Sequence, residues 1–282
     1  MPDPGRHLDL TPDPGADLDR DPPAELDASR AHPARIYDYW LGGKDNFAAD
    51  REAAEATIAV FPGIVASVRA QREFLGRAVR YLAGEAGIGQ FLDIGTGLPA
   101  ADNTHEVAQA VAPASRVVYV DNDPLVLAYA RALLASGPHG ATDYLDADLR
   151  DPGGILARAA ATLDFSRPVA VMLIGILHLL AGQDQPHAIV GRLMAAMPPG
   201  SALVILHPAS DVGSDLGQMT VEYNKRSATP ATLRSHEEVA RFFGGLDLLP
   251  PGLVHLGRWQ PGSAGPAPGP DMPAWTGLAF KP

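Results

Sequence analysis

Short apolar strands that alternate with helical segments constrain the fold of this chain more than any other feature of its sequence. Two of the strands, residues 169–174 (VAVMLI) and 202–206 (ALVIL), are apolar at every position. Strands of a parallel sheet have this composition when helices cover both faces of the sheet. The alternation therefore predicts an α/β fold with a doubly wound, mostly parallel sheet. The expected strands are residues 89–94, 116–120, 142–145, 169–174 and 202–206.

Capping residues mark several helices between these strands. Asn103 and Glu106 have the spacing of a capping box at the start of a helix expected over residues 103–111. Asp123 directly precedes Pro124, as an N-cap residue precedes a proline at the first helical position. Further helices are expected from residue 153, over 185–197 and at the Ser235/Glu238 capping pair, with closing strands at 246–248, 253–257 and near 274–280.

Composition divides the chain into three regions. Residues 1–33 hold seven prolines and seven aspartates and few large apolar side chains, so we expect a disordered acidic tail there. Residues 34–84 carry apolar side chains at helical spacing and predict an N-terminal helical lid. Residues 85–282 form the α/β core, interrupted by a Pro/Gly-rich loop at 261–270.

Charge and cysteine content exclude several classes of protein. The 282 residues carry 33 acidic and 22 basic side chains, a net charge of −11, which disfavours a nucleic-acid binder. The absence of cysteine excludes a disulfide scaffold, a thiolate metal site and a cysteine nucleophile, and we expect a cytoplasmic protein without a metal. The longest apolar run, 169–181, is shorter than the ~20 residues of a membrane span, and the acidic start does not resemble a secretory signal. We therefore expect no membrane partner.

Three successive strand ends carry groups that suit an adenosine-containing cofactor. After the first strand, Gly95 and Gly97 allow backbone N–H groups to approach a ligand closely. After the second, Asp121 can accept hydrogen bonds from both hydroxyls of a ribose. After the third, Asp148 can accept from an adenine amine while Leu149 packs on the ring. Since parallel strands end at one edge of the sheet, these groups are expected to converge on one ligand.

Two cofactors compete for this site. Residues 95–100 (GTGLPA) match the glycine pattern of an NAD-binding turn, with Asp121 as the ribose acid. However, Pro99 delays the helix that should bind the pyrophosphate, and Asp93 before the glycines would repel a pyrophosphate but suits an ammonium group. S-adenosylmethionine carries an amino-acid tail and a sulfonium cation but no phosphate. The sequence therefore favours S-adenosylmethionine.

Several longer stretches resemble those of one protein family. They are 34–51 (ARIYDYWLGGKDNFAADR), 91–99 (FLDIGTGLP), 103–109 (NTHEVAQ), 120–124 (VDNDP) and 223–226 (YNKR). The chain resembles a bacterial family known as S-adenosyl methyltransferase, formerly a domain of unknown function, within the class I S-adenosylmethionine-dependent methyltransferases. The resemblance covers nearly everything from Ala34 to Trp259. It implies a Rossmann-like class I fold, S-adenosylmethionine as cofactor and methyl transfer as reaction, and it implies no acceptor.

Each candidate cofactor residue has an expected role. Asp93 orients the amino end of the cofactor, Asn122 lies beside the adenine, and Gly175 leaves room near the sulfur. The bland alternative for Asp121 is a cap of the helix that follows it, and the one for Asp148 is a cap or a surface position, but the ribose and adenine roles are favoured. The candidate cofactor-binding residues are Asp93, Gly95, Thr96, Gly97, Asp121, Asn122, Asp148, Leu149 and Gly175.

Candidates for the acceptor side come from the lid and from two later strand ends. His178 equally suits a core histidine, His207 suits the end of a strand, and the tyrosines suit packing of a helix on the sheet. The candidate substrate-binding residues are Tyr37, Tyr39, Lys44 and Asn46, and the candidate catalytic residues are Tyr39, Lys44, His178 and His207.

The leading hypothesis is a methyltransferase that acts on an unknown small-molecule acceptor of secondary metabolism by in-line methyl transfer. Positioning and desolvation provide most of the catalysis, and a general base is needed only when the acceptor is protonated at the working pH. Two alternatives stay open at this stage: an NAD-dependent oxidoreductase, and a non-catalytic S-adenosylmethionine-binding regulatory protein. The oligomeric state also stays open.

Overall fold

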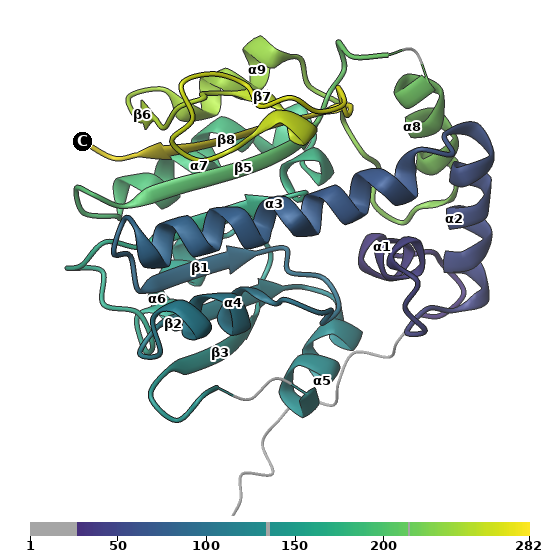
Figure 1. The fold of residues 1–282 in the computed structure, drawn as a ribbon. Coiled ribbons are helices and arrows are strands. Elements are labelled where there is room, and N and C mark those ends of the chain that lie inside the picture. Colours follow the sequence, from purple (N-terminus) through teal and green to yellow (C-terminus); the bar gives the residue numbers. More distant parts are fainter. Residues whose placement is uncertain (1–26, 134–135, 214) are drawn as a thin grey trace, which may run out of the picture.

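A central sheet with helices on both faces forms the body of the protein, in a computed structural model that describes residues 27–133, 136–213 and 215–282 (Figure 1). The strands are β1 Gln90–Ile94, β2 Arg116–Asp121, β3 Ala141–Asp146, β4 Ala170–Ile174, β5 Ala202–Pro208, β6 Asp247–Leu248, β7 Val254–His255 and β8 Ala274–Phe280. The predicted strands are confirmed, and each of their ends differs from the prediction by at most two residues.

The helices lie between and before these strands. They are α1 Pro33–Leu41, α2 Ala48–Val60, α3 Ile64–Gly84, α4 Thr104–Val111, α5 Pro124–Leu133, α6 Pro152–Ala159, α7 Pro186–Ala195, α8 Asp215–Arg226 and α9 His236–Ala240, with short 3₁₀ turns that include η1 Leu177–Leu179 and η4 Leu256–Arg258.

The predicted helix caps are present. The backbone N–H of Asn103 donates to Glu106 Oε2 at 2.8 Å, and Ser235 and Glu238 exchange hydrogen bonds in the same way before α9. Asp123 Oδ1 accepts a hydrogen bond of 2.8 Å from the backbone two residues further on, at the start of α5. These local signals determine where the helices leave the edge of the sheet.

The strand order is β3-β2-β1-β4-β5-β8-β6, with β7 paired to β8. Strands β1 to β5 are parallel, and β8 runs antiparallel to β5, β6 and β7. The chain moves outward from β1 to β2 and β3, and then returns past β1 to β4. Ligands of open α/β sheets bind at such a reversal, beyond the carboxyl ends of the strands.

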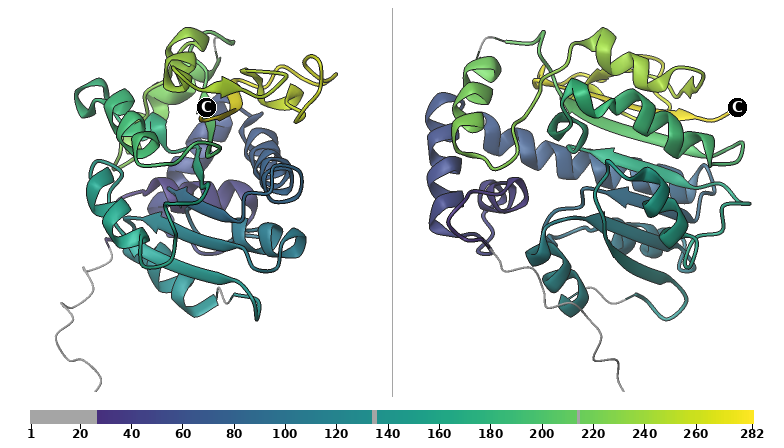
Figure 2. Two further views of the ribbon diagram at one scale, coloured as in Figure 1. Left: turned by 90° about the vertical axis from the view of Figure 1, so that its left-hand side faces the viewer. Right: turned by 180° about the vertical axis from the view of Figure 1, so that it is seen from behind.

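Helices bury both faces of the sheet at its centre, which explains why residues 170–174 of β4 and 202–206 of β5 are apolar at every position. Phe91 of β1 packs on one face against Phe74 of α3, and the next residue, Leu92, belongs to the core on the other face. That second core contains Ile155 of α6 and Leu193 of α7. The end view in Figure 2 displays these two helical layers on either side of the twisted sheet.

A helical cap stands beyond the carboxyl ends of the parallel strands (Figures 1 and 2). We define the cap as α1, α2, α8 and the first half of α3. Its own apolar cluster includes Ile36, Trp40, Val68, Leu216 and Tyr223. The cap therefore closes the edge of the sheet where a ligand is expected.

The lid predicted over residues 34–84 differs from this cap in two ways. The second half of α3 packs on the sheet through Phe74, Val79 and Leu82 and belongs to the core layer. The cap is completed by α8, a helix that the sequence pattern does not predict. Gly217 and Asn224 are poor helix formers, so tertiary packing stabilises α8 more than intrinsic propensity does.

Most of the predicted acidic tail, residues 1–26, lies outside the described residues. The last part of that tail is held against the cap. Arg35 donates hydrogen bonds to the carbonyl oxygens of Asp27 and Arg30, and Ala31 forms a bridge with Ser227. The predicted loop at 261–270 contains no helix or strand.

A helix that spans a membrane must be both long and apolar. Taken singly, no helix of the described chain is both long and apolar enough. Among the described helices, α2 and α3 taken together reach the length and apolar composition of a span, but the two are bent by 104° relative to each other.

Candidate functional site

A cavity of about 220 Å³ lies at the carboxyl ends of β1 to β4, between the sheet and the cap. It brings together the strand ends that the sequence singles out. The candidate cofactor residues in its wall are Gly95, Thr96, Gly97, Asp121, Asn122, Asp148, Leu149 and Gly175. The candidates Tyr37 and His178 line the same cavity, whereas Asp93, Tyr39, Lys44, Asn46 and His207 do not.

The turn after β1 depends on its two glycines. Gly95 and Gly97 have φ values of +75° and +65°, which side chains rarely adopt. A Cβ atom at Gly95 would lie 2.5 Å from Cγ1 of Ile176, so the turn also requires close packing there. No atom lies within 4 Å of the position of a Cβ at Gly97, so its backbone borders open space.

Asp121 holds this turn from the end of β2. Its Oδ2 accepts a hydrogen bond of 2.9 Å from the N–H of Gly97, and its Oδ1 accepts one of 3.0 Å from the N–H of Asp123. Burial raises the pKa of Asp121. The cap of α5 is Asp123, so the alternative reading of Asp121 as that cap is not needed. Each carboxylate oxygen keeps a lone pair for a ligand hydroxyl.

Asp148 at the third strand end belongs to a charged network. Asn122 Nδ2 donates to its Oδ2 at 3.3 Å, and Arg150 NH1 donates to the same oxygen at 3.1 Å. Arg150 also contacts Asp184 at 3.2 Å. Leu149, the next residue in the chain, is buried. The network orients the Asp148 carboxylate at the cavity wall.

Asp93 lies deeper than expected. Its Oδ2 accepts a hydrogen bond of 2.6 Å from Thr104, and burial raises its pKa to about 6. It lines a second cavity, of about 10 Å³, that shares Arg72, Thr96 and Gly97 with the large one. The glycine turn thus lies between Asp93 and the large cavity. This position suits a contact between Asp93 and a ligand in that cavity through one water molecule.

His178 is exposed to the large cavity without a polar partner. Neither nitrogen of its ring has a hydrogen-bond partner within the described part of the chain, and its Nδ1 is buried. Burial, together with the nearby Arg234 charge, lowers its pKa to about 4. Gly175, with φ +72°, lies three residues before it, and Gln71 Oε1 lies beside Gly175.

His207 lies behind the cavity wall and has a structural environment. Its Nδ1 lies 2.8 Å from the carbonyl oxygen of Pro208, and Arg234 NH1 lies 2.7 Å from its Nε2. Arg234 also donates to the carbonyl oxygens of Leu177 and Leu180. Burial lowers the pKa of His207 to about 3. The pair therefore holds the η1 turn that carries His178.

The lid candidates separate in the structure. Tyr37 lines the cavity, but its hydroxyl donates to the carbonyl of Val68 at 3.2 Å, and burial raises its pKa to about 12. Tyr39 points away and donates to Glu55. Lys44 is exposed in the loop after α1.

The polar groups of that loop have a structural explanation. Asn46 donates to Asp38 Oδ2 at 2.8 Å, and the backbone N–H of Asp45 donates to the same oxygen at 3.0 Å. Gly42, with φ +86°, ends α1. Asp38 thus stabilises the turn between α1 and α2. This structural role explains why polar residues, among them Asn46 and Lys44, are concentrated there.

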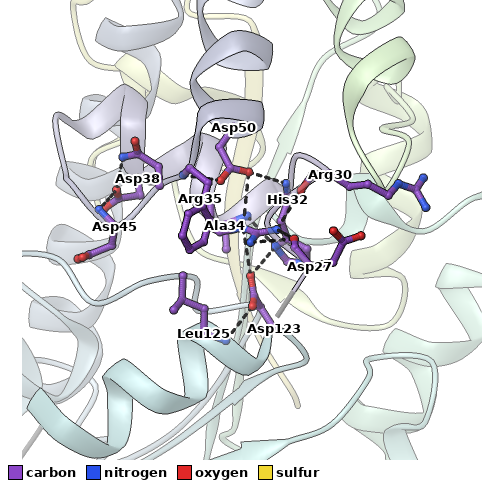
Figure 3. A network of polar contacts seen from close by, with 12 residues as sticks. Asp27, Arg30, His32, Ala34, Arg35, Asp38, Asp45, Asp50, Asp123 and Leu125 are labelled. Atoms are coloured by element: carbon purple, nitrogen blue, oxygen red, sulfur yellow. Dashed lines mark hydrogen bonds and ion pairs between the residues drawn. The ribbon is translucent and has the colours of Figure 1, made fainter. Parts of the chain in front are cut away.

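The N-terminal end of the cap contacts the strand end that carries Asp121. His32 Nδ1 lies 2.8 Å from Asp123 Oδ2, and Arg35 Nε lies 3.9 Å from that oxygen and 3.5 Å from Asp50 Oδ1 (Figure 3). Burial alone would raise the pKa of Asp123, but His32 and Arg35 outweigh it and lower that pKa. The cap is therefore tied electrostatically to the candidate cofactor site.

Sequence reasoning missed several groups of the cavity. Gln71 and Arg72 occupy polar positions of α3 that look like surface positions in the sequence. Arg150 directly follows Leu149, and its place at a strand end was a usable signal. His32 precedes a proline and gave no signal. Within residues 27–133, 136–213 and 215–282, no three His, Asp or Glu side chains lie together as metal ligands would.

The groups at this edge of the sheet fit S-adenosylmethionine. A buried carboxylate at the end of β2 suits ribose hydroxyls, and a polar network beside Leu149 suits an adenine. The open side of Gly97 and the carboxyl group of Asp93 suit an amino-acid tail. No step of this fit requires a phosphate-binding helix.

Known proteins support the same assignment. A DUF574 family protein from Streptomyces avermitilis is 45% identical, with 91% of this chain and 100% of that chain covered and a TM-score of 0.86. A proposed methyltransferase from Thermobifida fusca is 41% identical, with coverage of 92% and 98% and a TM-score of 0.83. An O-methyltransferase family protein from Burkholderia thailandensis, only 14% identical, shares the fold at a TM-score of 0.53 over 86% of this chain and 63% of that one. A search of curated proteins returned no match.

The predicted Rossmann-like class I fold is therefore confirmed, with S-adenosylmethionine as the cofactor. The family model described as S-adenosyl methyltransferase matches residues 19–282. On this match, the chain belongs to the S-adenosyl methyltransferase family and is an S-adenosylmethionine-dependent methyltransferase.

Proposed function

We propose that the enzyme methylates a hydroxyl group of a small, mostly apolar acceptor, with His178 as general base. The observation that carries this proposal is the imidazole of His178, which borders the cavity and has no hydrogen-bond partner among the described residues. Its pKa of about 4 keeps it unprotonated at neutral pH. A neutral imidazole can accept a hydroxyl proton.

The cap side of the cavity supports an apolar acceptor. Its walls include Trp40, Ile64, Val68, Met219 and Leu233, which together present a largely apolar surface. The polar hydroxyl of Tyr37 is already bonded to the backbone. An acceptor with one hydroxyl and a flat apolar body satisfies these walls without leaving a buried charge unpaired.

Size and charge favour a small molecule over a macromolecule. The cavity holds about 220 Å³ beneath the cap, and the chain carries a net charge of −11. A nucleic acid would need a basic surface to release its counterions. We place the enzyme in the bacterial cytoplasm. A chain without cysteine tolerates that reducing environment, and the two near relatives come from bacteria.

The strand ends hold the cofactor and leave its reactive end toward the cap. Bound S-adenosylmethionine supplies a methyl group activated by a sulfonium. Asp121 would accept from the ribose hydroxyls, Asp148 would accept from the adenine amine, and Leu149 would pack on the ring. Gly175 leaves room for the sulfur because it has no side chain, and Gln71 borders that space.

The chain then needs to align the acceptor and exclude water. His178 would take the hydroxyl proton at a ring nitrogen while the acceptor oxygen bonds to the methyl carbon and the bond from that carbon to the sulfonium sulfur breaks, with S-adenosylhomocysteine as the leaving group. Leu177 and Leu180, fixed by Arg234, hold the imidazole in place. The cap covers the cavity and excludes water, which strengthens each electrostatic contact.

The remaining candidates have weaker support as catalysts. His207 offers no free lone pair, because Arg234 donates to its Nε2. Tyr39, Lys44 and Asn46 lie outside the cavity. Among the described residues that line the cavity, no side chain favours an oxidoreductase or a non-catalytic regulatory protein. The family assignment favours neither alternative.

The experiment is transfer of a labelled methyl group from S-adenosylmethionine to a panel of small phenols, alcohols and amines, with peptides and RNA as comparison. We expect label on apolar hydroxyl compounds. His178→Asn should lower turnover roughly 10²- to 10⁴-fold while affinity for S-adenosylhomocysteine stays within about twofold. His139→Asn, at an exposed position, is the matched control. Label on amines alone, or full activity of His178→Asn, would refute the proposal.

A further inference from the structure

The large cavity extends beyond the strand ends assigned to the adenosine. The groups assigned to the adenosine follow β1, β2 and β3, whereas β4 and β5 lie on the other side of β1 in the sheet. Leu206 and Pro208 of β5 line the cavity on that side. The chain between α8 and α9 reaches the same place, where the backbone N–H of Arg234 donates to the carbonyl oxygen of Pro208 at 3.3 Å. An acceptor opposite the adenosine would therefore meet this part of the wall.

The chain that follows α8 lines this end of the cavity with every second residue, a pattern typical of an extended segment. We call residues 229–233 the wall segment. Its cavity-lining residues are Thr229, Ala231 and Leu233, whereas Pro230 and Thr232 lie outside the lining. Ala231 and Leu233 also pack against the apolar cluster of the cap. The wall segment thus belongs to the apolar side of the cavity.

Hydrogen bonds hold the backbone of the wall segment in place. Asn224 of α8 donates from Nδ2 to the carbonyl oxygen of Ala231 at 2.9 Å and accepts at Oδ1 from the N–H of Ala231 at 2.7 Å. The next N–H, of Thr232, donates to the carbonyl oxygen of His178 at 2.7 Å. Moving the segment away from the cavity would break these bonds and leave backbone groups unpaired. A large ligand therefore cannot push this wall back without loss of affinity.

Ala231 has the smallest of the three lining side chains and lies between Thr229 and Leu233. A larger residue there would project into the cavity, because the bonded backbone fixes the direction of the side chain. Protein interiors are close-packed, so a change of one methylene is felt. In an apolar pocket, one methylene changes the discrimination between substrates by roughly 10- to 200-fold.

We propose that Ala231 sets the largest apolar group that an acceptor can carry, and that Asn224 is the positioning residue that keeps this limit sharp. The inference rests on the proposed function, since it requires an apolar acceptor in the cavity, and it does not depend on the identity of the base. The acceptor class that follows is a hydroxyl compound whose apolar body ends against a methyl side chain. Neither residue is among the groups assigned to the cofactor, so cofactor affinity should not depend on them.

A series of para-alkylphenols, from para-cresol to para-butylphenol, tests this limit in calorimetric titrations of the protein saturated with S-adenosylhomocysteine. Ala231→Leu should weaken para-butylphenol at least about tenfold and para-cresol by no more than about threefold. Ala231→Val, a smaller change, should give the same order with smaller differences. Affinity for S-adenosylhomocysteine should stay within about twofold in both variants, which also shows that they fold.

The same substitution just before the wall segment is the matched control. Ala228 is exposed and does not line the cavity. Ala228→Leu should bind every phenol of the series like the wild type.

A double variant tests the role of Asn224. Asn224→Ala added to Ala231→Leu should restore part of the affinity for para-butylphenol, because a released backbone lets the leucine move aside. A purely structural role of Asn224 would instead weaken every phenol further and would overturn its assignment as the positioning residue.

Two further results separate this inference from the function on which it rests. Equal weakening of all phenols by Ala231→Leu, or no weakening of any, would overturn the inference and leave the proposed function intact. A wild-type complex that binds no phenol of the series would overturn the apolar hydroxyl acceptor and the inference with it.

Discussion

The Oδ2 oxygen of Asp121 accepts a hydrogen bond of 2.9 Å from the backbone N–H of Gly97. This bond joins the end of β2 to the turn that follows β1, so it holds the two strand ends together in the cavity wall. The other oxygen, Oδ1, accepts from the backbone N–H of Asp123, whose side chain contacts His32 directly before α1 of the cap. Asp121 is therefore connected by polar contacts both to the glycine turn and, through Asp123, to the start of the cap.

The two glycines of this turn should differ in their response to alanine. Gly95→Ala adds left-handed strain and a clash with Ile176, so it should lower the free energy of unfolding by about 2–4 kcal/mol. Gly97→Ala adds the strain alone, because open space surrounds its Cβ position, and should cost about 1–2 kcal/mol. Urea unfolding of both variants measures the difference, and the reverse order would contradict the observed packing.

Asp93 should destabilise the cofactor-free protein at neutral pH. Its pKa in the fold is raised to about 6, so the folded state favours the protonated form. Stability is then highest below the unfolded value of 3.8 and falls as the pH rises toward 6. Asp93→Asn removes this dependence and should raise the free energy of unfolding at pH 8 by about 1–3 kcal/mol.

The gain from Asp93→Asn should shrink as the pH falls to 4, and calorimetric melting at several pH values would record it. The same variant should bind S-adenosylhomocysteine more weakly, since the ammonium loses its carboxylate. A variant less stable than wild type at pH 8 would contradict a raised pKa for Asp93.

Turnover and cofactor affinity should depend on pH in different ways. His178, with a pKa of about 4, is neutral throughout pH 6 to 8, so kcat at saturating cofactor should be flat there. The KM for the cofactor should rise as the pH falls below about 6, where Asp93 takes up a proton. Initial rates across both substrates separate the two effects. A fall in kcat centred near 6.5, the value of an exposed histidine, would contradict the environment of His178.

Arg234 should be needed for the fold of the η1 turn and for turnover, but not for cofactor binding. Arg234→Leu leaves two buried carbonyls and His207 without their donor, and should cost roughly 2–4 kcal/mol of stability. Its kcat should fall because His178 loses its support. Arg241→Leu, an exposed neighbour, is the control. Loss of S-adenosylhomocysteine binding in a folded Arg234→Leu protein would contradict this division of roles.

Much of the fold was predictable because its signals are local. The apolar runs at β4 and β5 require burial on both faces, and the caps at Asn103 and Asp123 determine where α4 and α5 begin. The turn of Gly95 and Gly97 follows from the same local logic. These features depend on neighbours in the chain, which a single sequence displays.

The rest depends on contacts between distant residues. Helix α8 has weak intrinsic propensity, and Leu216 and Tyr223 become core residues only against α1 and α2. The bond from Arg234 to His207 spans 27 residues, so nothing in the sequence separates His207 from His178 as a candidate base. Asn46 and Lys44 drew attention through a polar turn that Asp38 organises for structural reasons. Arg72 and Thr96 line the same cavity only because α3 packs on the sheet beside β1.

The central claim is that the carboxyl ends of β1, β2 and β3 jointly hold the adenosine of the cofactor, and one calorimetric comparison tests it most directly. Asp121→Ala should weaken S-adenosylhomocysteine roughly 10- to 100-fold. Asp146→Ala, at the exposed position directly opposite on β3, should bind it like the wild type. An Asp121→Ala protein that folds and binds S-adenosylhomocysteine with undiminished affinity would contradict the account.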